Sequence, residues 1–214
     1  GAVVRRATLE GAPVFEVTKL ELEALTQGAV HQGVAMEIAS YDYADALELL
    51  DRVSATGRKP LFVALDQVTD PHNLGAVLRS AGAFGVDGVI IPQRRSADVN
   101  ATVWKVSAGA AARVPVAKET NLVRTLEAFK ARGCFVVGLD GNGSVSVDNL
   151  NLADQPLVLV TGAEGKGLSR LVSQTCDEIA SINIRAAVES LNAAVATGIA
   201  LYEVDRVRRT IQGD

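Results

Sequence analysis

Short apolar runs alternate with longer amphipathic patterns from about Pro60 to the end of the chain. Each apolar run has the length and composition of a strand that is buried on both faces. The runs predict strands at Leu61–Leu65, Gly88–Ile91, Phe135–Leu139, Leu157–Val160 and Ile179–Ile184. The amphipathic patterns predict helices at Asn73–Ala83, Asn100–Ala108, Leu122–Arg132, Leu168–Cys176 and about Leu191–Arg209. This alternation is typical of an α/β domain with a mostly parallel sheet and helices on both faces, in which ligands bind at the carboxyl ends of the strands.

The first 38 residues have a different pattern. They predict the end of a helix, a short strand at Pro13–Val17, a short helix, and another strand within HQGVAMEI at positions 31–38. We interpret residues 1–38 as the C-terminal part of a small α/β domain whose beginning lies outside this chain. Residues 39–59 contain an acidic amphipathic helix and a glycine-containing turn, which suit a linker. Residues 60–214 then form the main domain.

The composition narrows the class of protein. The chain has 214 residues, of which 48% are hydrophobic and 21% are charged, as expected for a globular protein with a sizeable core. No apolar run approaches the roughly 18 to 20 residues of a membrane-spanning helix, and the N-terminus has no signal-peptide pattern. We expect a cytoplasmic protein without a membrane role. Cys134 and Cys176 lack CxxC spacing and the two histidines form no ligand cluster, so no metal site or disulfide framework is expected.

The net charge of the chain argues against a protein that binds nucleic acid through a large overall positive charge. The formal net charge is −4, whereas charge-driven binders are strongly basic. Arginines nonetheless cluster at Arg5-Arg6, at Arg94-Arg95 and at positions 206, 208 and 209. Such clusters are more often solvated faces, and they would form an RNA footprint only if they met on one surface.

The segment DQVTDPHNLGAVLRS at positions 66–80 joins the first predicted strand to a helix. Asp70 is a good N-cap with Pro71 at the first helical position. Core packing explains the apolar residues of this helix but not Asn73 and Arg79. These two lie about 120° apart on an ideal helix, so they would converge only if Asn73 sat in the entry turn. A capped, solvated helix explains the segment equally well.

The segment TGAEGKGL at positions 161–168 follows another buried strand. Its three glycines allow the backbone to approach a ligand closely. Their spacing does not match a dinucleotide or phosphate-binding fingerprint, which counts against a nucleotide-dependent oxidoreductase of the Rossmann type. Glu164 would repel phosphates and suit a cationic or hydroxyl-bearing ligand, although a lone Glu in a loop is more often simply exposed.

The segment SLNAAVATGIALYE begins at Ser190, a reasonable N-cap for a helix of small residues. Tight packing against another backbone is the ordinary explanation of such a helix. Ser190 and Asn192 flank Leu191 just before it, however, where polar side chains can face a ligand.

Together, DPHNLGAVLRSA, GAEGKGL and ESLNAAVATGIALYE resemble, in order and separation, the three motifs of the SpoU family of RNA ribose 2′-O-methyltransferases. The resemblance spans roughly Leu61 to Arg208, includes RRSADVNATVWKVSAGAA, and is strongest to the ribosomal-RNA branch. The combination is highly specific, although each motif alone is not. Residues 1–38 are similar to the end of that branch's small RNA substrate-binding domain, near the segment His31-Gln32-Gly33.

The resemblance implies a C-terminal trefoil knot, S-adenosylmethionine as methyl donor, RNA as substrate and a homodimer. It places Asn73, Arg79, Glu164, Ser190 and Asn192 at the family's polar active-site positions. The donor-binding positions that it implies are Gly138, Leu139, Asp140, Gly162, Glu164, Gly167, Ile182, Ile184, Leu191 and Ala196.

In the implied reaction, a ribose 2′-hydroxyl attacks the methyl carbon of the donor and displaces its sulfur. We expect the ribose to be that of a guanosine in large-subunit ribosomal RNA. The hydroxyl needs a proton acceptor and in-line positioning. A guanidinium with a pKa above about 12 is a poor base. We therefore expect Arg79 to clamp phosphate and orient the hydroxyl, with Glu164 or the 3′-phosphate as acceptor. The scheme requires no metal.

Three positions depart from the family pattern, which usually has Pro, Gly and Ser where this chain has Asn183, Ala186 and Ala194. The first two lie in the loop around the donor. Asn183 lacks the fixed φ of Pro, and Ala186 does not readily adopt the positive φ that Gly allows, so both substitutions are expected to affect the affinity for the donor. The alternatives are therefore a catalytically inactive RNA-binding or ribosome-assembly protein on the same fold, and a methyltransferase that acts on transfer RNA.

Overall fold

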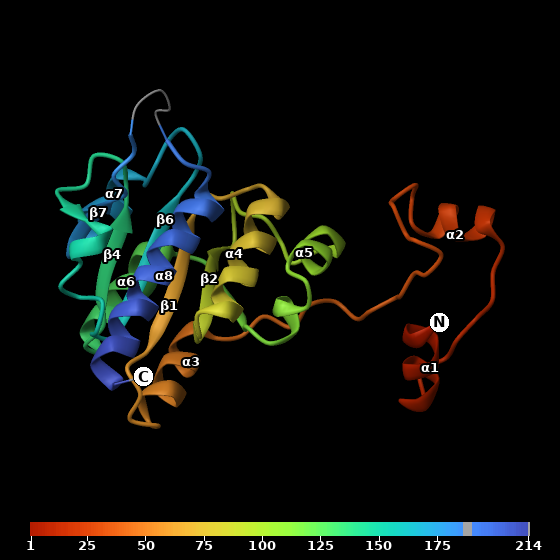
Figure 1. Cartoon of the computed structure of the whole chain (residues 1–214). Coiled ribbons are helices and arrows are strands. Elements are labelled where there is room, and N and C mark those ends of the chain that lie inside the picture. The colour runs from red at the N-terminus through yellow and green to blue at the C-terminus, as the bar shows by residue number, and fades with distance from the viewer. Residues whose placement is uncertain (186–189, 214) are drawn as a thin grey trace. The chain divides into compact units, whose positions relative to one another are not determined.

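The computed structural model describes residues 1–185 and 190–213, which divide into two compact units, Gly1–Ser40 and Tyr41–Asp214. Its helices are α1 (Ala2–Leu9), α2 (Lys19–Leu25), α3 (Ala46–Ser54), α4 (Pro71–Ala83), α5 (Ala101–Val106), α6 (Leu122–Ala131), α7 (Arg170–Thr175) and α8 (Ala193–Gln212) (Figure 1). Its strands are β1 (Leu61–Asp66), β2 (Gly88–Pro92), β3 (Val116–Glu119), β4 (Phe135–Leu139), β5 (Val145–Ser146), β6 (Leu157–Gly162) and β7 (Glu178–Ser181).

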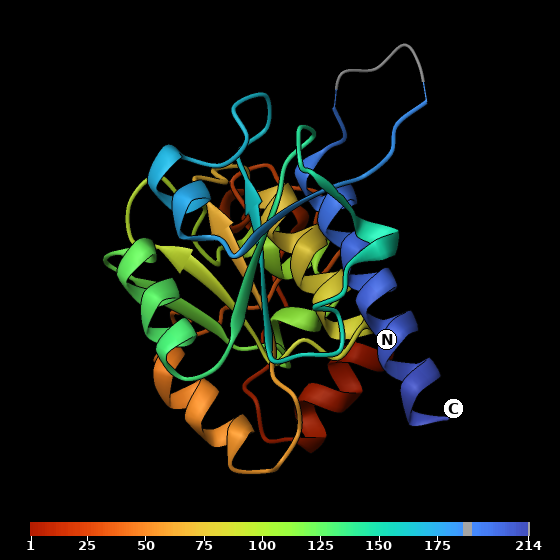
Figure 2. The same cartoon turned by 90° about the vertical axis from the view of Figure 1, so that its left-hand side faces the viewer.

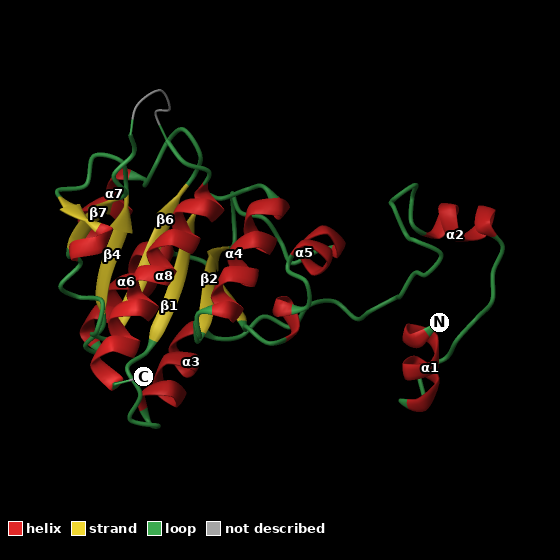
Figure 3. Ribbon diagram, viewed as in Figure 1, coloured by secondary structure: helices red, strands yellow, loops and turns green. Residues whose placement is uncertain are grey.

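The second unit is built on a seven-stranded sheet in the order β3-β2-β1-β6-β4-β7-β5. All of the pairings between its described strands are parallel, and the sheet lies between helices (Figure 3). In the central pair, Leu61 is opposite Leu157 and Asp66 is opposite Gly162. The predicted fold class is therefore confirmed. The trefoil knot stays a prediction, with which this strand order is consistent.

Alternate residues of the strands belong to two apolar layers, one on each face of the sheet. Helices cover both faces (Figure 2). Leu61, Val63 and Leu65 face α4, α5 and α8, whereas Phe62 and Ala64 face α3, α6 and α7. All five of these strand side chains are buried. Continuous apolar runs are required here because both faces of a parallel sheet are covered.

The five predicted strands of the main domain are present, although β7 ends at Ser181 rather than at Ile184. The short strands β3 and β5 were not predicted. β3 reads VAKE and β5 reads only VS, so neither has the apolar run from which the others were recognised. Both are outer strands of the sheet and gain their conformation from pairing with β2 and β7.

The first unit contains α1 and α2 but neither of the strands predicted at Pro13–Val17 and within positions 31–38, so those two predictions were wrong. A strand needs a partner to satisfy its backbone groups, and these segments have none in the described unit. Their side chains are exposed as well, with Phe15 at 81%. The predicted short helix is α2, which begins with a capping box formed by Thr18 and Glu21.

The helix of the predicted linker is α3, and it packs within the second unit. Ala46, Leu49, Leu50 and Val53 are buried on its inner side. The unit begins at Tyr41, whose hydroxyl accepts a hydrogen bond from the Val116 amide at 3.0 Å. The domain limits expected from the sequence stay a prediction.

The C-terminal arginines do not form one exposed cluster. The half-buried Arg208 guanidinium donates to the backbone oxygens of Lys59, Pro60, Ala153 and Gln155. Its neighbours at 206 and 209 pair with acidic residues of the same helix. Arg208 therefore joins α8 to the segments that enter β1 and β6. Among the described residues, no helix combines the length and apolar character needed to span a bilayer.

Candidate active site

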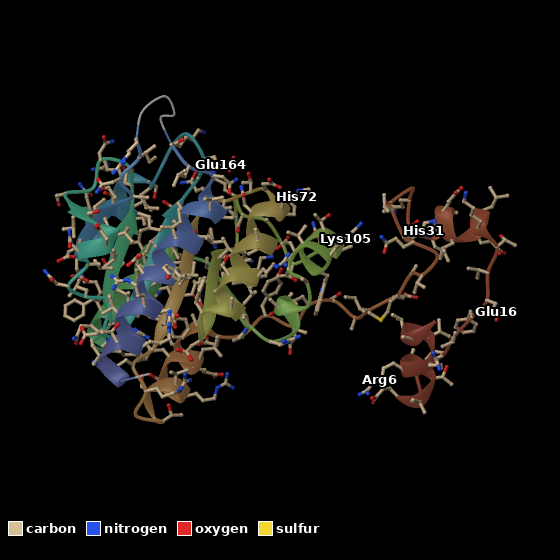
Figure 4. All side chains as sticks on the ribbon, viewed as in Figure 1. Arg6, Glu16, His31, His72, Lys105 and Glu164 are labelled. Carbon is tan, nitrogen blue, oxygen red and sulfur yellow. The ribbon has the colours of Figure 1, made fainter. Side chains whose placement is uncertain are left out.

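The loops that follow β1, β2, β4, β6 and β7 meet at the carboxyl end of the parallel sheet, where this architecture places its ligands. They enclose two cavities of about 410 and 340 Å³. Ala163, Glu164 and Lys166, from the loop after β6, line both cavities and form the wall between them. Glu164 beyond β6 and His72 in the first turn of α4 lie at this same end of the sheet (Figure 4).

The first cavity collects most of the predicted donor-binding residues. Its lining includes Leu139, Asp140, Gly162, Glu164, Gly167, Ile182, Ile184, Leu191 and Ala196. Predicted Gly138 does not line it. Gly138 lies within β4, where an added Cβ would come within 2.5 Å of Leu168 and 2.8 Å of Ile179. This glycine therefore serves packing beneath the cavity.

The wall between the cavities depends on a very close approach of two backbone segments. The loop after β6 turns back on the strand, and the Gly167 amide donates to the Ala163 oxygen at 2.9 Å. A Cβ on Gly162 would lie 2.1 Å from the Gly167 carbonyl carbon and 2.2 Å from its oxygen. Gly167 itself has a φ of 64°, in the region that favours glycine. The glycines of this loop are thus required by its fold.

Three predicted catalytic side chains converge on the wall. The Asn192 amide nitrogen donates to the Asn73 side-chain oxygen at 2.8 Å and to Glu164 Oε1. The Asn73 amide nitrogen donates to the same Glu164 oxygen at 3.2 Å. Asn73 is 6% exposed, so its amide is committed to this cluster rather than to water. We call Asn73, Glu164 and Asn192 the amide–carboxylate cluster.

Two members of the amide–carboxylate cluster, Asn73 and Asn192, lie at the N-terminal ends of helices. The Asn192 side-chain oxygen caps α8 by accepting from the backbone amides of Ala194 and Val195. Asn73 is in the first turn of α4, which Asp70 caps through the amide of His72 at 2.9 Å. This hydrogen bond lowers the pKa of the Asp70 carboxyl from its ordinary value. The caps fix both asparagines before any ligand binds.

The other two predicted catalytic residues are placed differently. Ser190 lines the first cavity. Arg79 is exposed on α4 and lines neither cavity. Within residues 1–185 and 190–213 its side chain has no hydrogen bond or ion pair. Asn73 already lies inside the helix, so the sixth residue after it points to another side of α4.

The second cavity was not predicted. Besides the shared wall it is lined by Gln67, Val68, Thr69, Asp70, Asn73 and Arg95. The sequence showed Arg94 and Arg95 as a charge cluster but did not distinguish them, and only Arg95 lines the cavity. No local pattern carries that distinction, because it depends on how the loop after β2 meets the loop after β1.

The departures from the family pattern are partly visible. The Asn183 side chain donates to the Ser146 hydroxyl at 3.1 Å, and Ala194 is buried in the first turn of α8. Ala186 lies outside the described residues. Within those residues no group of three or more His, Cys, Asp or Glu side chains is placed to hold a metal ion. The wall itself carries one carboxylate, two amides and the Lys166 ammonium group between two ligand-sized spaces.

Comparison with known families and proteins gives a consistent result. Residues 60–202 match the model of the SpoU rRNA Methylase family, and residues 1–44 match a model described as RNA 2′-O ribose methyltransferase substrate binding. An uncharacterized tRNA/rRNA methyltransferase of Mycobacterium ulcerans is 51% identical over 97% of this chain, and one of Mycobacterium tuberculosis is 50% identical over 96%. The chain spans 66% and 63% of the lengths of these two relatives.

Solved structures with the same fold include two whose descriptions name a bound cofactor. An AdoMet-bound rRNA methyltransferase from Sinorhizobium meliloti is 26% identical, with a TM-score of 0.75 over 96% of this chain and 76% of that one. The SpoU methyltransferase AviRb from Streptomyces viridochromogenes, in complex with AdoMet, is 28% identical, with a TM-score of 0.71 over 91% of this chain and 80% of that one.

Proposed function

This chain belongs to the SpoU rRNA methylase family, and on that premise we propose that it transfers a methyl group from S-adenosylmethionine to the 2′-hydroxyl of a ribose in RNA. The observation that carries the proposal is the position of the amide–carboxylate cluster. Glu164 lies in the wall shared by the two cavities, so its carboxylate meets both a donor on one side and an acceptor nucleotide on the other.

The first cavity fits S-adenosylmethionine by its chemistry. Leu139, Ile182 and Leu191 provide an apolar surface for a purine ring. The carboxylates of Asp140 and Glu164 face the same space and offset the positive charges of a sulfonium and an ammonium group. Bound there, S-adenosylmethionine supplies a methyl group on a positively charged sulfur. Two carboxylates and one cation, Lys166, line this cavity, so its charge favours a cationic ligand over a phosphate-bearing nucleotide.

The chain's part in the reaction is to position the hydroxyl and to accept its proton. As the bond from O2′ to the methyl carbon forms and the carbon–sulfur bond breaks, the 2′-hydroxyl proton must leave. Glu164 Oε1 accepts from the two asparagine amides, whereas Oε2 has no hydrogen-bond partner among the described residues. We propose that Oε2 accepts the proton while Asn73 and Asn192 hold the carboxylate in place.

For the RNA, we propose a guanosine of large-subunit ribosomal RNA, which implies a cytoplasmic protein. The match of residues 1–44 to a substrate-binding model supports RNA binding, and one structural relative is described as an rRNA methyltransferase. Transfer RNA is the second candidate. The curated relatives are named tRNA/rRNA methyltransferases, and another structure with this fold concerns 2′-hydroxyl methylation of a tRNA nucleotide.

We also propose a homodimer formed through α8. Val195, Ile199 and Tyr202 are between 37% and 49% exposed and lie on one side of that helix by their spacing. Tyr202 contacts Phe84 edge to face, which extends the apolar surface to the end of α4. Arg79 on the exposed side of α4 is then available to contact an RNA phosphate, which is one part of the role expected from the sequence. It lines neither cavity, so the other part, orienting the reacting hydroxyl, has no support from the arrangement of this chain.

The test compares the wild type with Glu164→Gln. Gln keeps an oxygen that accepts from the two asparagines but places an amide where a proton acceptor is required. We expect methyl transfer to unmodified ribosomal RNA transcripts to fall about 100-fold, the lower end for loss of a general base. Glu127→Gln, an exposed change on α6, is the control and should keep the wild-type rate.

Two results would contradict parts of this proposal. Transfer by Glu164→Gln at the wild-type rate would move proton acceptance away from Glu164, for instance to an RNA phosphate. A folded wild type that binds RNA but gives no heat with S-adenosylmethionine in titration calorimetry would favour the inactive RNA-binding protein.

A further inference from the structure

We propose that the second cavity is the subsite for a backbone phosphate of the RNA nucleotide whose ribose reacts, and that Arg95 is the residue that contacts this phosphate. The proposal rests on the methyl-transfer function above. It assigns a role to a cavity, and to an arginine, that the three sequence motifs leave unexplained.

The position of the second cavity favours the acceptor nucleotide. The cavity lies over β1, between the loops that follow β2 and β6, whereas the first cavity lies over β6, β4 and β7. The two spaces are adjacent, with Glu164 in both linings and Asn73 only in the second. A ribose with its 2′-oxygen at Glu164 and its methyl donor in the first cavity therefore extends its phosphate into the second.

The loops around the second cavity are held in unusual conformations. Gln67 and Arg95 are non-glycine residues with φ values of 61° and 58°, in the left-handed region. A hydrogen bond from the Ala97 amide to the Val68 oxygen at 3.0 Å joins the two loops. Such conformations persist only where the surrounding structure holds them, and they are frequent at ligand sites. They place Arg95 at the cavity, whereas Arg94 is outside it.

The charges of the second cavity suit an anion. Its two carboxylates already have partners, because Asp70 accepts from the His72 amide and Glu164 accepts from the two asparagines. The side chains of its two cations, Arg95 and Lys166, have no ion pair or hydrogen bond within residues 1–185 and 190–213. A planar guanidinium can bind two phosphate oxygens at once. Lys166 also lines the first cavity, so of these two cations Arg95 is the one that lines the second cavity alone.

The experiment measures RNA and donor binding separately in the full chain. The probe is a short fluorescein-labelled single-stranded RNA, titrated by anisotropy at several salt concentrations. S-adenosylmethionine is titrated by calorimetry in parallel. The variants are Arg95→Gln and Arg95→Lys, with Arg94→Gln as the adjacent control and Arg124→Gln on α6 as the distant one. All three glutamine variants remove one positive charge from an exposed arginine.

We expect Arg95→Gln to weaken RNA binding about tenfold, the effect of one lost charge-assisted hydrogen bond. It should also reduce the slope of log K against log salt by about 0.7, the value for one phosphate contact on a single strand. Donor affinity should be unchanged. Arg95→Lys should recover part of the lost affinity, because Lys keeps the positive charge but lacks the planar guanidinium that can bind two phosphate oxygens. Arg94→Gln and Arg124→Gln should each cost less than about twofold, with little change of slope.

The subsite is refuted if Arg95→Gln and Arg94→Gln weaken RNA binding equally while the wild type binds the donor and methylates RNA. A weaker donor affinity in Arg95→Gln would also overturn it, because Arg95 does not line the first cavity. If the wild type binds no donor at all, the proposed function is refuted, and the subsite proposal, which rests on that function, is refuted as well.

Discussion

Gly162→Ala is the substitution whose effect the structure determines most directly. Gly162 ends β6 and faces the backbone of Gly167, where the loop turns back on the strand. The new Cβ would lie 2.1 Å from a carbonyl carbon, whereas real Cβ atoms stay at least 3.0 Å from other heavy atoms. The segments must therefore separate by at least about 0.9 Å, the difference between these two distances. Because the obstacle is backbone, no side-chain rotation relieves it.

This displacement affects both stability and binding. Overpacking in a close-packed region costs about 1–3 kcal/mol of unfolding free energy. The loop that moves carries Glu164 and Lys166 and is the shared wall of both cavities. We therefore expect Gly162→Ala to lower the urea midpoint by a corresponding amount and to weaken donor binding at least tenfold in titration calorimetry, since a small misplacement of a positioned group has a large effect.

Gly141→Ala is the matched control for stability. Gly141 lines the same cavity, but an added Cβ there meets nothing within 4 Å, and its φ is not in the left-handed region. The urea midpoint of Gly141→Ala should match the wild type. If Gly162→Ala is as stable as Gly141→Ala and binds the donor equally well, the loop does not pack on β6 as described.

Three further predictions concern buried groups elsewhere. Thr197→Val leaves the buried Thr161 hydroxyl without its 2.7 Å partner and should cost about 1–3 kcal/mol in urea unfolding, whereas the exposed control Thr210→Val should cost little. Arg208→Lys cannot reach four backbone oxygens and should cost about 2 kcal/mol, while the control Arg209→Lys should not. Burial raises the pKa of the Cys134 thiol to about 11 and of the Cys176 thiol to about 12, so iodoacetamide at pH 8 should label the folded chain far more slowly than the urea-unfolded chain. Because these folded pKa values lie above the ordinary one, the associated stability is complete below about pH 8.5 and should fall as the pH rises through 11; rapid labelling of the folded chain at pH 8 would contradict both expectations.

The fold of the second unit was predictable because its strands are continuous apolar runs. LFVAL and LVLV can be buried only in the middle of a covered sheet, and they form β1 and β6 at its centre. β3 and β5 could not be predicted in this way. Their residues are partly polar, and their conformation comes from neighbours far away in the sequence, such as Val89 opposite Val116. The predicted strand at Pro13–Val17 failed for the opposite reason, since a strand-like sequence found no partner.

The sequence grouped those site residues that lie within the three motifs. Asn73, Glu164 and Asn192 are separated by as much as 119 residues, yet the resemblance to a family grouped them, and the structure joins them by hydrogen bonds. Gly138 was grouped with its neighbours Leu139 and Asp140, which line the first cavity, whereas Gly138 itself faces Leu168 and Ile179; a role for it in donor binding stays a prediction. Arg95 was not distinguished from Arg94 because its position follows from the contact of two loops.

The most direct test of the central claim is to find which atom of the RNA receives the methyl group. Unmodified ribosomal and transfer RNA transcripts are incubated with the full chain and S-adenosylmethionine labelled with deuterium in its methyl group, then digested to nucleosides and analysed by mass spectrometry. We predict that the label appears on the ribose of a 2′-O-methylated nucleoside, that the undigested RNA resists alkaline cleavage at the phosphodiester 3′ to that ribose, and that Glu164→Gln reduces the yield of labelled nucleoside about 100-fold. Label on a base, or no label in either RNA from a folded chain that binds the donor, would contradict the assignment.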